Sequence, residues 1–196
     1  MRKMKILKNR LALSTVVTTL IILVVSVLLA GVVTYFAINV VSTRVQQESI
    51  KVSCPSVWVD AAGTAQAGML ITNTGGRDVV ITQVEIRGIA ATFGAGGNVY
   101  DQLNVGGTIP GSLSAQLAAG LTAGTVNVFT GDTTTNLKLS VGQLVLTSGS
   151  TMAVYITAPT SVSINDVGTT IGMTVFTAQA MYYQETNVLA TSVNIP

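Results

Sequence analysis

An uncharged stretch of 33 residues near the N-terminus constrains this chain more than any other feature. Residues 11–43 contain no Asp, Glu, Lys or Arg, and the ten residues before them hold five of the ten cations of the chain. A helix of this length would be roughly 50 Å long at about 1.5 Å per residue. About 20 apolar residues already cross the ~30 Å hydrocarbon core of a bilayer. The stretch can therefore span a membrane and extend beyond it.

The basic leader predicts the orientation of this helix. The positive-inside rule places residues 1–10 in the cytoplasm and the chain after Arg44 outside. An ordinary secretory signal has an apolar region of only ~7–15 residues, followed by a cleavage site between small residues. No such site follows the stretch here. The precursor is therefore expected to be held in the membrane by this helix.

The rest of the chain has the composition of an exported surface. Only 9% of all residues are charged, and without the first ten residues five cations face eight carboxylates. A mildly acidic chain does not favour nucleic-acid binding, which needs clustered Lys and Arg to neutralise phosphates. Cys54 is the only cysteine, so no intrachain disulfide can form. We interpret it as a small apolar side chain beside Pro55.

One face of the predicted helix carries small residues. Ser26, Ala30 and Thr34 are spaced by four, and Ala37 follows at a spacing of three, so all four lie on one side. Such a ladder lets helix backbones approach closely, and we predict helix–helix packing through these four residues. The alternative is that they are the small residues that membrane-spanning helices commonly carry. After residue 43 the pattern becomes amphipathic, and the helix is expected to continue to residue 52.

The N-terminal residues resemble a known family. The basic leader and the segment RLALSTVVTTLIILVVSVLLAGVVTYFAINV are similar to the N-terminus of archaeal type IV pilins, which are related to archaellins. The resemblance implies that a membrane-embedded class III signal peptidase removes the leader. It also implies that the retained helices form the core of a homopolymeric helical filament, which a pilus assembly ATPase and a membrane platform build.

Two positions remain open for the removal of the leader. The family usually has a small residue just before the cut and a cation nearby, so the candidates are Ala12 followed by Leu13 and Arg10 followed by Leu11. Ala12 is favoured because a small side chain fits a constrained peptidase subsite better than Arg. The glycine and glutamate typical of bacterial pilins are missing at the corresponding positions. The predicted organisation is a leader at 1–12, a helix at 13–52 and a head at 53–196.

The predicted head consists of short strands. Its apolar residues alternate in runs rich in Val, Ile, Thr and Tyr, separated by turn residues. Seven or eight such strands predict an immunoglobulin-like antiparallel sandwich, so the fold class is α+β. The segment ITNTGGRDVVITQVEIRG also resembles the early hairpin of archaeal pilin and archaellin heads. Residues 88–136 are expected to be a surface excursion with one short helix at 113–121. The strands are predicted at residues 68–72, 79–87, 126–129, 137–141, 144–146, 152–156, 173–176 and 180–183.

No residue pattern in the chain predicts catalysis. The chain has no histidine, and its eight carboxylates are dispersed in sequence. Neither a dinucleotide fingerprint nor an EF-hand spacing is present. We therefore predict no enzymatic activity and no catalytic, cofactor-binding or metal-binding residue. Arg77, Asp78, Glu85 and Arg87 alternate in sign and are predicted to form weak ion pairs between subunits.

The expected function is that of a structural subunit of an extracellular archaeal type IV pilus, which serves adhesion and needs no cofactor. Two alternatives stay open. The filament could be an archaellum used for motility, since the apolar helix does not distinguish the two. The chain could also be a monomeric surface receptor or adhesin whose helix remains in the membrane.

Overall fold

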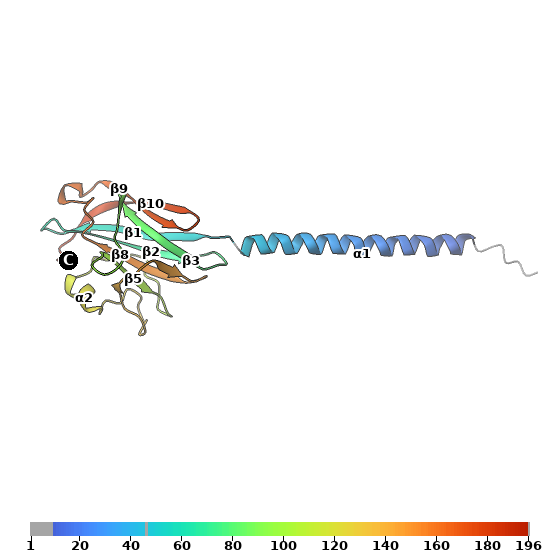
Figure 1. Cartoon of the computed structure of the whole chain (residues 1–196), viewed down its shortest axis with the longest axis horizontal. Coiled ribbons are helices and arrows are strands. Elements are labelled where there is room, and N and C mark those ends of the chain that lie inside the picture. Colours follow the sequence, from blue (N-terminus) through green and yellow to red (C-terminus); the bar gives the residue numbers. More distant parts are fainter. Residues whose placement is uncertain (1–9, 46, 196) are drawn as a thin grey trace, which may run out of the picture. The chain divides into compact units, whose positions relative to one another are not determined.

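The chain divides after Val45 into two compact units. A computed structural model describes residues 10–45 and 47–195. The first unit contains the helix α1 (Arg10–Val45), and the second contains a β-rich head (Figure 1). The predicted α+β layout, a long apolar helix followed by a mostly β head, is confirmed.

The helix α1 is uninterrupted but shorter than predicted. It contains 36 residues and no proline, whereas the predicted bounds were 13–52. It ends at Val45 because the chain joins the head soon afterwards. The carbonyl oxygen of Ser49 accepts hydrogen bonds from the N–H groups of Thr74 and Gly75, at 2.9 and 3.0 Å. Strand β1 then begins at Ile50, inside the segment that was expected to be helical.

The strands of the head join in one sheet. Its order is β4-β3-β9-β10-β1-β2-β8-β5-β6, with β7 also paired to β3, and every pair is antiparallel except β1 with β10. A sandwich of two separate immunoglobulin-like sheets stays a prediction. The ten strands of the described residues are β1 (Ile50–Val59), β2 (Ala65–Asn73), β3 (Val79–Ile86), β4 (Ile89–Ala90), β5 (Val99–Leu103), β6 (Lys138–Leu139), β7 (Leu144–Leu146), β8 (Thr151–Thr157), β9 (Thr170–Thr177) and β10 (Met181–Ala190).

The main core lies inside the curve of this sheet. Met69 and Ile71 of β2 and Val154 of β8 belong to the same buried cluster as Val84 of β3 and Val175 of β9. These strands lie at distant places in the sheet order, so the sheet must curl for their side chains to meet. Alternation along each strand directs every second side chain into this core.

A second core covers the opposite face of β1, β2 and β8. Leu70 and Tyr155 point away from the main core, yet both are fully buried. Leu121, Phe129 and Leu137, from the long connection between β5 and β6, cover them. This connection includes the short helix α2 (Ala118–Ala123). Residues 104–137 therefore lie on the surface, as expected for the excursion predicted at 88–136, but they pack onto the sheet through these side chains. The first part of the predicted excursion instead contains strands β4 and β5.

Several predicted strand positions differ from the structure. Residues 126–129 were predicted as a strand, but they form no strand, and their apolar side chains instead pack onto the second core. Strands β1 and β5 were not predicted. The bulge in β1 falls at Cys54, whose φ of 50° is rare for a residue with a side chain. The Cys54 thiol is half-buried, with Sγ 3.3 Å from the carbonyl oxygen of Gly111.

Candidate functional surface

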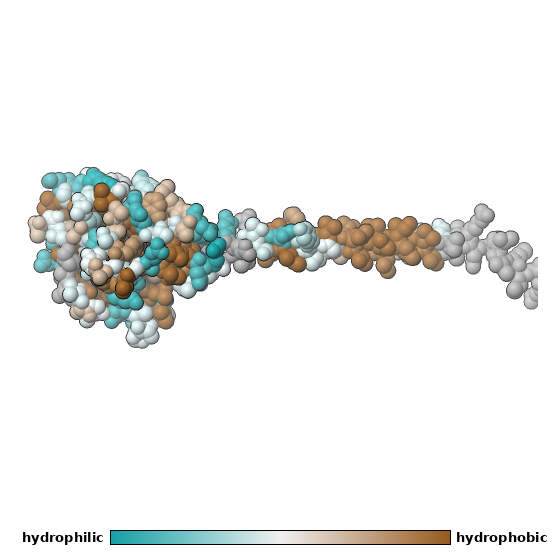
Figure 2. All heavy atoms as spheres, in the orientation of Figure 1, coloured by the Kyte–Doolittle hydropathy of each residue, from teal (hydrophilic) through white to brown (hydrophobic). Residues whose placement is uncertain are grey.

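The surface of α1 is apolar and uncovered. Every side chain from Ser14 to Thr43 is exposed, and this segment is long and apolar enough to cross a membrane. Its large apolar side chains are 45–72% exposed, from Val40 to Tyr35. Figure 2 shows apolar surface over most of the helix, with paler residues towards the end that joins the head. A helix that is apolar all round needs lipid or other protein around it.

The four predicted packing residues lie on this surface. Ser26, Ala30, Thr34 and Ala37 are all exposed and keep the helical spacing that places them on one face. The Ser26 hydroxyl donates to the carbonyl oxygen of Ile22 at 2.6 Å, and the Thr34 hydroxyl donates to that of Ala30 at 2.7 Å. The hydroxyls are therefore satisfied by the helix itself, and the face presents only small groups. Helix–helix packing through it stays a prediction.

The predicted processing residues lie in the first turns of α1. Arg10, Leu11, Ala12 and Leu13 are helical in the described chain, but the description does not extend to their side chains. Residues 1–9, the first part of the predicted leader, also lie outside the described residues. The choice between a cut after Ala12 and a cut after Arg10 therefore stays as predicted.

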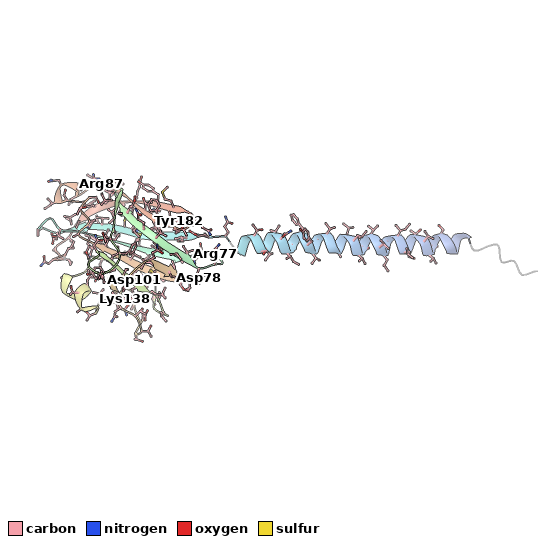
Figure 3. The ribbon with its side chains drawn as sticks, viewed as in Figure 1. Arg77, Asp78, Arg87, Asp101, Lys138 and Tyr182 are labelled. Carbon is pink, nitrogen blue, oxygen red and sulfur yellow. The ribbon has the colours of Figure 1, made fainter. Side chains whose placement is uncertain are left out.

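The first residues of the head contact the sheet through Glu48 and Ser49. The carboxylate of Glu48 accepts a hydrogen bond from the Thr177 hydroxyl at the end of β9. Burial and the nearby Glu48 carboxylate raise the pKa of Tyr182 (Figure 3). A Cβ at Gly75 would lie 2.8 Å from the backbone nitrogen of Ser49, so the turn after β2 closes over this segment only with glycine. Sequence reasoning missed these contacts because it placed residues 46–52 in the helix.

The charges near the β2–β3 hairpin are mostly engaged within the chain. Arg87 and Asp166 form the one ion pair of the described residues, at 2.8 Å, and Arg87 holds the pKa of Asp166 below its usual range. Asp78 accepts a backbone N–H, and Glu85 accepts a neighbouring glutamine amide. Figure 3 labels Arg77, Asp78 and Arg87. Asp78 and Glu85 each accept only one of these bonds, so the pairing of the four charges between subunits stays a prediction.

Asp132 is a buried carboxylate whose hydrogen bonds all come from its own connection. It accepts the backbone N–H groups of Val105, Thr134 and Thr135, and the hydroxyls of both threonines. The hydrogen bond from the Val105 N–H lowers the pKa of Asp132 most. Together with the bonds from Thr134 and Thr135 it holds this pKa far below its ordinary value. These donors use the acceptor capacity of the carboxylate, so Asp132 organises the loop. No group of three potential metal ligands occurs among the described residues.

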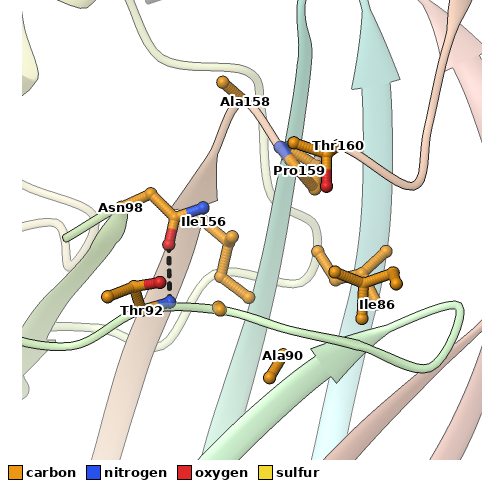
Figure 4. A pocket seen from close by; sticks show the side chains of 10 residues that line it. Ile86, Ala90, Thr92, Asn98, Ile156, Ala158, Pro159 and Thr160 are labelled. Carbon is orange, nitrogen blue, oxygen red and sulfur yellow. Dashed lines mark hydrogen bonds between the residues drawn. The ribbon is translucent and has the colours of Figure 1, made fainter.

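One cavity of about 130 Å³ lies between the β3–β4 hairpin and the turn after β8 (Figure 4). Ile86, Ile156 and Pro159 give it apolar walls. Its one amide, that of Asn98, already accepts the Thr92 N–H at 2.8 Å and donates to a backbone carbonyl of β8. None of the residues that line it carries a titratable side chain.

Taken together, the described residues define a chain with one helix able to span a membrane, followed by a β-rich domain. No protein-family model matches the chain, and a comparison with curated proteins gives no match. The relation to archaeal type IV pilins therefore rests on the N-terminal residues and on the hairpin segment of the head, and it stays a prediction.

Proposed function

We propose that this chain is the structural subunit of an extracellular archaeal type IV pilus and that it polymerises through α1. The observation that carries the proposal is the uncovered apolar surface of α1 between Ser14 and Thr43. Such a surface is unstable in water by roughly 25 cal/mol per Å² of apolar area. Lipid covers most of this surface in the precursor, and neighbouring helices cover it in the filament.

The hydroxyls of the helix suit this transfer from lipid to protein. Because Ser26 and Thr34 donate to carbonyls of their own helix, no hydrogen bond has to break when the surroundings change. Ala30 lies between them on the same face, where a small side chain permits close helix contact. The head then stands on the outside of the filament and serves adhesion.

A charge on the small-residue face should block assembly. In cells that produce the filament, we expect Ala30→Glu to abolish it, because a carboxylate between packed helices loses its water without gaining a partner. Filaments sheared from the cells would be counted by electron microscopy after sedimentation. Ala30→Ser keeps the small size without the charge, and this control should assemble normally.

The head also needs a control in the same experiment. Val141 is 87% exposed, so Val141→Glu should leave filaments unchanged. Normal filaments from Ala30→Glu would contradict the assignment of this face to helix packing. Loss of filaments from Val141→Glu would show instead that added charge by itself prevents assembly.

The membrane-anchored receptor remains a second candidate because Ser14–Thr43 alone suffices to cross a membrane. Under that reading the protein stays with membranes after shearing and keeps Met1. Under the pilus proposal it sediments as filaments, and N-terminal sequencing gives Leu13 or Leu11. A motor-dependent rotation assay separates a pilus from an archaellum.

A further inference from the structure

The span of α1 is longer than a membrane requires. The 30 residues Ser14–Thr43 would extend about 45 Å, against a hydrocarbon core of about 30 Å. Residues 14–34 alone account for about 31 Å on the same scale. If α1 stands close to the membrane normal with its N-terminal end embedded, the final turns of the helix lie outside the hydrocarbon.

Beyond this distance α1 carries its first amide side chain, while the Thr43 hydroxyl still donates to a carbonyl of the helix, that of Asn39. Between residues 14 and 34 the hydroxyls of Thr18, Thr19, Ser26 and Thr34 each donate to a carbonyl of their own helix. Asn39 is the first side chain with an amide, which has two donors and an acceptor. It is exposed, and no hydrogen bond of its amide occurs among the described residues. Such a group is costly in hydrocarbon and is satisfied by water.

The two aromatic residues of α1 lie between these regions. Tyr35 and Phe36 are adjacent, and their side chains are 72% and 69% exposed. Tyrosine favours the membrane–water interface, where its ring contacts apolar groups and its hydroxyl contacts water. Figure 2 shows the same change, since the helix surface becomes paler towards the end that joins the head.

From length, hydrogen bonding and aromatic position together, we infer that Tyr35 and Phe36 lie at the outer membrane–water boundary of the precursor. Residues 14–34 then form the lipid-embedded segment. Residues 37–45 form a water-exposed stalk of the same helix. The inference rests on the membrane-held precursor of the proposed function, but not on filament formation.

The two parts of α1 therefore leave different surroundings when filaments form. Residues 14–34 exchange lipid for neighbouring helices, which changes the polarity around them little. In the stalk, Ile38 and Val41 are 64% and 61% exposed and exchange water for protein. Most of the hydrophobic driving force for assembly thus comes from the stalk, because only there is apolar surface removed from water.

Cysteine labelling of the full chain in phosphatidylcholine vesicles tests the boundary. Cys54→Ala removes the native thiol, and single variants Ser26→Cys, Ser42→Cys and Thr133→Cys are compared, the last in an exposed turn of the head. A membrane-impermeant maleimide reacts with the hydrated thiolate. We expect Ser42→Cys to react at a rate similar to Thr133→Cys. Ser26→Cys should react at least about tenfold more slowly until detergent is added.

Protection of Ser42→Cys to the level of Ser26→Cys would overturn the inference, because the boundary would then lie beyond the stalk. Rapid labelling of Thr34→Cys would also overturn the inference, because the boundary would then lie before Tyr35.

A double variant, Tyr35→Leu with Phe36→Leu, tests the role of the aromatic pair. It should slow the labelling of Ile38→Cys, because without the two aromatic residues the next polar side chain is that of Asn39. Unchanged labelling there would contradict the role of the aromatic pair. Absence of filaments alongside the expected labelling would contradict only the pilus proposal.

Discussion

At the scale of single residues, buried polar side chains organise the head. The Gln102 amide donates to Asn127 and to the carbonyl of Thr135, while its oxygen accepts the Val128 N–H. Tyr155 stacks on Trp58 with ring centroids 6.2 Å apart, and burial raises its pKa to about 12. These contacts join residues distant in sequence. No local pattern indicates them, and only the folded chain brings them together.

Asp132 makes the stability of the head dependent on pH. Its pKa is lowered in the folded state, so its contribution is present above the ordinary Asp pKa of about 4 and is lost as the pH falls below it. Asp132→Asn should therefore lower Tm by a few degrees at pH 7, with a difference from wild type that shrinks towards pH 3. Calorimetry at several pH values measures this.

The control for this variant is Asp78→Asn, which changes an exposed carboxylate that accepts a single backbone N–H. It should shift Tm much less at pH 7. An Asp132→Asn effect that grows on acidification would contradict the assigned hydrogen bonding.

At the scale of elements, the connection between β5 and β6 acts as a structural layer. Its apolar side chains cover a face of β2 and β8 that would otherwise meet water. Sequence composition could not predict this, because Gly, Thr and Ser between apolar residues are also typical of loops. The sequence did contain one indication of such a layer, the nearly continuous apolar character of β2 and β8. A strand that is buried on both faces does not alternate between apolar and polar residues.

Truncation of Phe129 tests whether this layer is integral to the fold. Phe129 is fully buried, so Phe129→Ala should reduce the free energy of unfolding by about 3–5 kcal/mol. Denaturant titration of the full chain in detergent, followed by Trp58 fluorescence, reports on the same cluster. Val141→Ala, at an exposed position, should stay within about 0.5 kcal/mol of wild type. A similarly small effect of Phe129→Ala would show that the layer is loosely attached.

At the scale of the whole molecule, the two units have different requirements. Both apolar clusters of the head consist of residues from Ile50 onward, whereas the described span Ser14–Thr43 of α1 is not covered by other parts of the chain. The head thus has what it needs to fold in water, and the helix does not. The division into an apolar helix and a head with its own core follows from the uncharged stretch, and for this reason it could be predicted from the sequence.

Removal of α1 should therefore leave a soluble domain. We expect the chain from Gln46 onward to be monomeric by analytical ultracentrifugation without detergent and to unfold cooperatively. The full chain should need detergent or lipid under the same conditions. Aggregation of the truncated chain, with loss of its near-ultraviolet circular dichroism, would show that the head depends on α1.

Periodicity predicted the elements that are long or regular and missed those that depend on partners. The apolar run of α1 and the Val-rich alternation of β3 are local signals. The bounds of β3 were predicted to within one residue, whereas α1 was predicted to continue to residue 52 and ends at Val45. Strand β1 was missed because Cys54 and Pro55 interrupt its alternation, while its pairing with β2 continues on both sides of the bulge. The small-residue face of α1 was read directly from spacing, since helical geometry alone places its members together.

Strand β1 also determines how the head would bear a pulling force. It is the first strand after α1, and it lies inside the sheet, paired with β2 along most of its length and with β10 at its end. Tension that arrives through α1 along the direction of β1 loads many backbone hydrogen bonds at once. They must break together rather than one after another. Mechanical unfolding depends on the barrier to that first rupture, so the attachment point favours a slow response to strain.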